Sequence, residues 1–194
     1  MLKRLSLAAA ILAAATAPAF AHLNPAEHGS LLSGFSHPLF GADHILVMVA
    51  VGLWAAQIGT GSSRNALWIV PAAFVGTMAA GFLLALGGIS LPFVEPAILA
   101  SVIGLGLLVA AAVKLPVSAA AAVVGVFALF HGHAHGGELG SAGALQFGIG
   151  FMIATALLHA AGIALGFGIA RLSPYIARIL GAATALLGLS LAFA

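Results

Sequence analysis

The chain has 194 residues, of which 63% are hydrophobic and only 5% are charged. Soluble domains carry about 25% charged residues, so this composition excludes an ordinary soluble protein and indicates a membrane protein. No cysteine is present, which excludes disulfides, thiolate metal ligands and thiol nucleophiles. The formal net charge is +2, but two of the six basic residues, Lys3 and Arg4, belong to an N-terminal segment that we expect to be removed. We therefore predict no nucleic-acid partner.

This N-terminal segment has the pattern of a cleavable secretory signal peptide. Its two basic residues precede an apolar stretch over 5–15, and the small-residue triplet Ala19-Phe20-Ala21 follows. We predict a signal peptide over residues 1–21 with cleavage after Ala21, so that the mature chain begins outside the cytoplasm. An uncleaved short helix is the alternative.

Six apolar runs follow, and each is close to or above the roughly 17–25 residues that cross a bilayer. Backbone polar groups in lipid have to be satisfied within their own segment, so these runs should be helices. We predict an all-α membrane protein, with a single domain over 22–194 that forms a six-helix transmembrane bundle in contact with membrane lipid. The expected location is the bacterial inner membrane, which the chain crosses several times. The expected spans are 38–58, 66–88, 94–113, 117–134, 143–170 and 176–193.

The basic residues favour one orientation of this bundle. If the mature N-terminus lies in the periplasm, the connections that face the cytoplasm are 59–65, 114–116 and 171–175. These connections carry Arg64, Lys114 and Arg171, and Arg178 lies just inside the sixth span. The positive-inside rule expects this placement. We therefore predict that both termini are periplasmic.

The first candidate site lies at the start of the first span, where His37, Asp43, His44 and Met48 interrupt an apolar run. A charge inside the bilayer costs about 2.5–3.5 kcal/mol on insertion scales, so this carboxylate needs a partner or a function. On one continuous helix, His37 and His44 share a face and Met48 lies one turn beyond. Asp43 could close a metal site or orient an imidazole by a hydrogen bond. A polar pair that only joins two helices is the alternative.

The second candidate site lies at the outer end of the fourth span, where His131, His133, His135 and Glu138 occur within eight residues. On a helix, His131, His135 and Glu138 form one stripe of ligands, and the glycines at 132, 136 and 137 suggest that the helix loosens there. Imidazole and carboxylate ligands together suit Zn²⁺, Ni²⁺ or Co²⁺ rather than Mg²⁺ or Ca²⁺. The topology places both sites on the same side of the membrane, so they can meet. A histidine-rich surface loop without function is the alternative.

Four further residues are secondary candidates. His159 lies deep in the fifth span and is either the next ligand inward or a hydrogen-bonded packing residue. Glu95 could add a carboxylate at the mouth of the site, and His22 and His28 could collect metal outside the membrane, His22 with its free α-amino group after cleavage.

The two motifs resemble those of a known family. The pattern His37-Pro-x-x-Gly41-x-Asp43-His44-x-x-x-Met48-x-x-x-Gly52 resembles the signature of the HupE/UreJ family, accessory membrane proteins of nickel hydrogenase and urease systems. Phe130-His131-Gly-x-Ala-His135-Gly-x-Glu138 is similar to the second motif of that family, in which His133 occupies a variable position. The resemblance implies a nickel or cobalt permease with ligands at His37, Asp43, His44, His131, His135 and Glu138.

The leading hypothesis is therefore a permease or facilitator that takes up Ni²⁺ or Co²⁺ and supplies hydrogenase or urease maturation. We expect no permanently bound cofactor, because the ion is the cargo, and we do not expect an enzyme. The residues alone indicate a divalent transition-metal site, whereas nickel in particular comes from the resemblance. Two alternatives stay open: an intramembrane zinc hydrolase, and a sensor or chaperone that faces the periplasm. A homo-oligomer also stays open.

Overall fold

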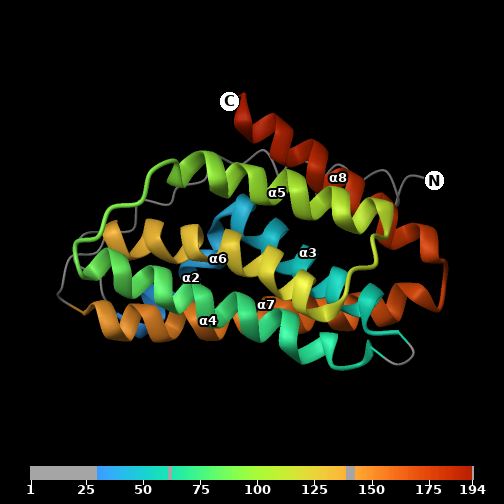
Figure 1. Ribbon diagram of the computed structural model, residues 1–194, viewed down its shortest axis with the longest axis horizontal. Helices are drawn as coiled ribbons and strands as arrows, with labels where there is room; N and C mark the ends of the chain where they lie inside the picture. Colours follow the sequence, from blue (N-terminus) through green and yellow to red (C-terminus); the bar gives the residue numbers. More distant parts are fainter. Residues whose placement is uncertain (1–29, 61–62, 139–142, 194) are drawn as a thin grey trace, which may run out of the picture.

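The protein is an array of long helices in a computed structural model that describes residues 30–60, 63–138 and 143–193 (Figure 1). The predicted all-α fold is confirmed, since the described part of the chain contains helices and no strand. The helices are α2 (Leu31–Phe40), α3 (Ala42–Ile58), α4 (Ala66–Leu86), α5 (Val94–Ala111), α6 (Val117–Glu138), α7 (Ala144–Ala170) and α8 (Pro174–Ala192). The predicted signal peptide over 1–21 lies outside the described residues.

The helices have the length and composition of membrane spans. Within the described residues, α4, α5, α6, α7 and α8 are each long and apolar enough to cross a bilayer, and α2 and α3 together pass the same test as a bent pair. This gives five spans, or six if the bent pair counts as one. The chain is thus a multi-pass membrane protein. The long fifth run, expected over 143–170, forms the single helix α7.

The first span differs from the expectation. A continuous helix over 38–58 was wrong: α2 ends at Phe40, α3 begins at Ala42, and the two axes differ in direction by 84°. Gly41 between them has an extended backbone, and a Cβ there would crowd the side chains of Asp43 and His44. Helix interiors disfavour glycine because it loses the most backbone entropy, which makes this position a natural break. The expected shared helix face of His37 and His44 therefore does not exist.

The glycines of the second motif also have another role than expected. The sequence suggested that the helix loosens around Gly132 and Gly136, but α6 continues to Glu138. A Cβ at Gly132 would overlap the backbone of Met78, and one at Gly136 would overlap the backbone of Phe82. These glycines let the backbones of α6 and α4 touch, as small residues do between membrane helices, and these two helices form the most extensive contact of the bundle.

One end of the bundle carries the basic residues. Arg64, Lys114 and Arg171 lie in the connections between α3 and α4, α5 and α6, and α7 and α8, and all three connections lie at the right-hand end of Figure 1. The same end is tied together by side chains that donate to α5 and the residues just after it: Trp54 Nε1 to the Val113 carbonyl (2.8 Å) and Arg178 Nε to the Ala110 carbonyl (2.8 Å). We call it the basic end.

Candidate metal centre

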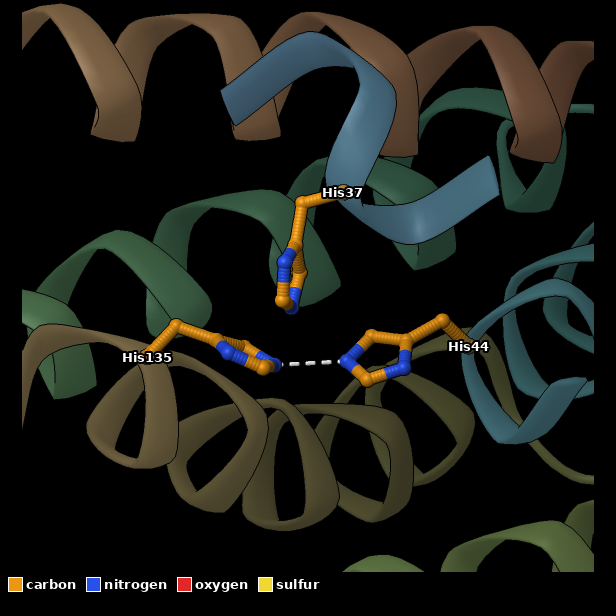
Figure 2. Close-up of side chains that lie close together, drawn as sticks. All are labelled: His37, His44 and His135. Carbon is orange, nitrogen blue, oxygen red and sulfur yellow. Dashed lines mark hydrogen bonds between the residues drawn. The ribbon is translucent and has the colours of Figure 1, made fainter. Parts of the chain in front are cut away.

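Three histidines from three helices meet near the end of the bundle that is opposite the basic end. His37 comes from α2, His44 from the first turn of α3 and His135 from the last turn of α6, and their rings point toward one another (Figure 2). One ring nitrogen of each can be chosen so that all three lie within 4.8 Å of one another. The Nε2 atoms of His44 and His135 are 2.6 Å apart. We call this group the three-histidine cluster, and it joins the two motifs that the sequence placed on one side.

Asp43 orients one ring of the cluster. Its Oδ1 lies 2.9 Å from Nδ1 of His44. An ionised carboxylate only accepts hydrogen bonds, so Nδ1–H of His44 donates and the lone pair is on Nε2, which faces His135. A carboxylate bonded to the far nitrogen of a ligand histidine is a common arrangement in metal sites, where it fixes the tautomer and strengthens the ligand. Of the two roles expected for Asp43, the geometry favours this orienting one.

His131 lies next to the cluster but outside it. It stands one turn before His135 on α6, it is fully buried, and its ring centre is 5.5 Å from that of His44. Its Nε2 lies 2.9 Å from Oγ of Ser101 on α5. Sequence reasoning missed Ser101, for which the signal was a single hydroxyl in an otherwise apolar run.

Aromatic rings form the wall of the cluster. The ring centre of Phe151 lies 4.9 Å from His135, 5.9 Å from His37 and 6.0 Å from His44. Phe147, one turn earlier on α7, lies 5.6 Å from His37. Sequence reasoning missed both, because phenylalanines at helical spacing in an apolar run look like ordinary core. An apolar wall limits solvent access to a bound ion and thereby strengthens its electrostatic interactions.

Several predicted site residues lie away from the cluster. Met48 is buried in the core, and its backbone carbonyl accepts a hydrogen bond from His159, which lies deep on α7. Nε2 of His133 donates to the carbonyl of Ile89 at 2.7 Å, so this histidine binds the connection before α5. Glu95 is exposed in the first turn of α5.

For three other candidates, the side chain lies outside the described part of the structure. Glu138 is the last residue of α6, but its side chain is outside the described part of the structure. His22 and His28 fall within residues 1–29, which are also outside it.

The cluster has the donor set of a transition-metal site. His44 and His135 are each 6% exposed, whereas His37 is half-buried, so one ligand can meet solvent while two are held inside. Imidazole nitrogens suit Zn²⁺, Cu²⁺, Ni²⁺ and Co²⁺ and are poor ligands for Mg²⁺ or Ca²⁺. The charge of Asp43 offsets part of the cost of holding a dication among apolar side chains.

Comparison with known proteins agrees with these motifs. Residues 9–191 match the family described as HupE / UreJ protein. The chain belongs to the HupE/UreJ family. It is 48% identical to protein HupE of Rhizobium leguminosarum bv. viciae over 185 residues, which cover 93% of this chain and 94% of that relative. No solved structure matches the chain.

Membership in the HupE/UreJ family confirms the resemblance that the two motifs indicated. The chain is an accessory membrane protein of a family connected with nickel and cobalt, and its three-histidine cluster is a group of side chains that could hold a metal ion.

Proposed function

We propose that this HupE/UreJ protein is a permease or facilitator that moves Ni²⁺ or Co²⁺ across the inner membrane into the cell. The observation that carries the proposal is the three-histidine cluster: nitrogen ligands from α2, α3 and α6 converge inside an apolar bundle, beside a carboxylate. Polar and ionisable groups at membrane depth are costly and generally mark an ion or substrate pathway.

The arrangement of the cluster suggests how an ion would enter. A hydrated dication first meets His37, which is the half-buried member. It then exchanges water for the Nε2 atom of His44, whose lone pair Asp43 keeps available, and for a nitrogen of His135. Neutral imidazoles bind the ion less tightly than negatively charged thiolates would, so the ion can be released on the cytoplasmic side.

The orientation belongs to the same proposal. Basic residues mark cytoplasmic connections, so the basic end would face the cytoplasm and the cluster the periplasm. In this orientation a cleaved signal peptide and a periplasmic C-terminus both fit. The exposed apolar side chains inside the spans, such as Leu107 and Leu157, would then face lipid. Inside the cell, the ion would serve the maturation of a hydrogenase or urease.

Flux in proteoliposomes tests the proposal. The full-length protein is reconstituted and the entry of Ni²⁺, Co²⁺, Zn²⁺ and Cu²⁺ is followed, with and without a pH gradient. We expect entry of Ni²⁺ or Co²⁺ by the native protein and loss of entry in His44→Ala, because that variant removes a central ligand while α3 keeps a good helix former. Equal amounts of both proteins have to be present in the liposomes. Native protein without flux, or His44→Ala with undiminished flux, would show the proposal to be wrong.

A zinc hydrolase is the second candidate, because three histidines with one open position also describe catalytic zinc sites. Among the described residues, the carboxylate at the cluster is bonded to His44 rather than directed at a position for water, which favours transport. Tight retention of one zinc per chain together with hydrolysis and without flux would favour the hydrolase.

A further inference from the structure

Two buried histidines deeper in the bundle each have a ring nitrogen without a hydrogen-bond partner among the described residues. These atoms are Nδ1 of His131 and Nε2 of His159. The side chains are 0% and 1% exposed, so neither nitrogen can be hydrogen-bonded to bulk solvent. Leaving a buried acceptor unpaired is costly, and such groups in native proteins call for an explanation. We call them the buried histidine pair.

The tautomer of His159 is set by the backbone of α3. Its Nδ1 lies 2.8 Å from the carbonyl oxygen of Met48, and a carbonyl can only accept, so the proton is on Nδ1 and the lone pair on Nε2. The contact depends on glycines: a Cβ at Gly52 would overlap the carbonyl of His159, and one at Gly162 the carbonyl of Val49. The close approach of α3 and α7 therefore fixes this ring with its free nitrogen inside.

The tautomer of His131 is set by Ser101. The single hydroxyl proton of Ser101 donates to the carbonyl of Ile98 at 2.6 Å, so its Oγ accepts from Nε2–H of His131 at 2.9 Å. The lone pair of His131 is then on Nδ1. Both buried histidines are thus held as neutral rings with a free lone pair, which is the form that binds a metal.

The pair continues the line of the three-histidine cluster toward the basic end. His131 is one helical turn from His135, and the ring of Phe74 packs against both His131 (5.9 Å between ring centres) and His159 (4.9 Å). On α7, His159 comes eight residues after Phe151, the residue that walls the cluster, so it lies roughly 12 Å deeper along the helix.

The neighbouring side chains suit a late transition-metal ion. Met78 stands one turn after Phe74 on α4, and Thr155 stands one turn before His159 on α7. Oγ1 of Thr155 donates to the sulfur of Met78 at 3.8 Å, and both side chains are fully or almost fully buried. Thioether and imidazole ligands favour late transition metals over Mg²⁺ and Ca²⁺.

We propose that Nε2 of His159 takes the ion over from Nδ1 of His131, a residue that the family motif already implies as a ligand, so that the path continues past the cluster and the ring of Phe74. This inference rests on the proposed function, since it gives the transported ion its next ligands. It assigns His159 to transport rather than to packing.

One variant at His159 separates ligation from packing. In His159→Asn, the side-chain amide can still donate to the Met48 carbonyl, as Nδ1–H does, but the Nε2 lone pair is gone. We expect equilibrium binding of Ni²⁺ at the cluster to stay unchanged, whereas flux into proteoliposomes falls about tenfold or more, as for the loss of a group that supports a metal site.

The control removes a histidine of the same kind outside the path. His133→Gln keeps an amide donor for the Ile89 carbonyl, and its flux should equal that of the native protein. Flux in His159→Asn equal to that of the native protein would overturn this inference and leave the proposed function standing. No flux in the native protein would overturn both.

A second variant covers the case in which His159→Asn does not insert into the membrane. His131→Gln keeps a donor for Ser101 and removes the Nδ1 lone pair. It should show the same loss of flux with Ni²⁺ binding retained, and undiminished flux in this variant would overturn the inference by itself.

Discussion

The three-histidine cluster and the buried histidine pair use the same side chain in opposite settings. In the cluster, His37 is half-buried and a carboxylate lies beside His44, so the cluster is close to both a negative charge and solvent. In the pair, His131 and His159 are enclosed, and neutral backbone and hydroxyl oxygens set their tautomers. From this difference we infer two roles. The three-histidine cluster, which is charged, captures the hydrated ion, and the buried histidine pair, which is neutral, binds it weakly and passes it on.

The largest effect is expected at the contact between α4 and α6, because α6 carries one histidine of the cluster and one of the buried histidine pair. Gly132→Ala places a Cβ into the backbone of Met78, so α6 has to move away from α4 and carries His131 and His135 with it. Overpacking of this kind costs about 1–3 kcal/mol. We expect a lower melting temperature in detergent and loss of both Ni²⁺ binding and flux.

Gly137→Ala is the matched control for this variant. Among the described residues, nothing lies within 4 Å of a Cβ at Gly137, and alanine favours the helix over glycine, so stability and flux should be retained or improved. Equal melting temperatures for the two variants would show that the α4–α6 contact is less tight than described.

The second-largest effect should come from removing the negative charge that lies at the cluster and not at the buried histidine pair. Asp43→Asn keeps the shape of the side chain and an oxygen that accepts from Nδ1–H of His44, but removes the negative charge. Loss of a carboxylate that supports a ligand histidine typically costs 10–100-fold, so we expect Ni²⁺ binding, measured by titration calorimetry, to weaken by about that factor. Glu95→Gln, which neutralises an exposed carboxylate on α5, should bind as the native protein does. Native affinity in Asp43→Asn would mean that charge does not distinguish the two regions.

The general architecture could be predicted from the sequence because it depends on coarse quantities. Six apolar runs and a 5% share of charged residues indicate a multi-pass helical protein whichever way each helix faces. The meeting of the two motifs could be predicted in the same way, from the alternation of spans, and His44 and His135 do come together. These inferences need only length, order and chemistry.

The details of the site could not be predicted, because they depend on how each helix is rotated about its axis. Helices that are apolar on all sides carry no periodic signal of which face is inside, so Ser101 and Phe151 looked like ordinary members of their spans. The bend at Gly41 was missed for a related reason: an apolar run with one glycine is compatible with a straight helix, and the bend is supported by contacts with other helices. The consequence is that three helices, not two, supply the cluster.

The smallest effect should arise at Ser101, whose hydroxyl is hydrogen-bonded to His131 of the buried histidine pair. Ser101→Ala removes the acceptor of Nε2–H of His131, so the proton is free to move to Nδ1 and to block the lone pair to which we assign ion binding. A hydrogen bond of about 1 kcal/mol corresponds to a roughly fivefold effect, and we expect flux to fall by about that factor while Ni²⁺ binding at the cluster is unchanged. Thr184→Val, which removes a buried hydroxyl on α8, is the matched control and should transport normally. If Ser101→Ala weakened binding and flux equally, the two regions would act as one site, and the division between capture and passage would have to be abandoned.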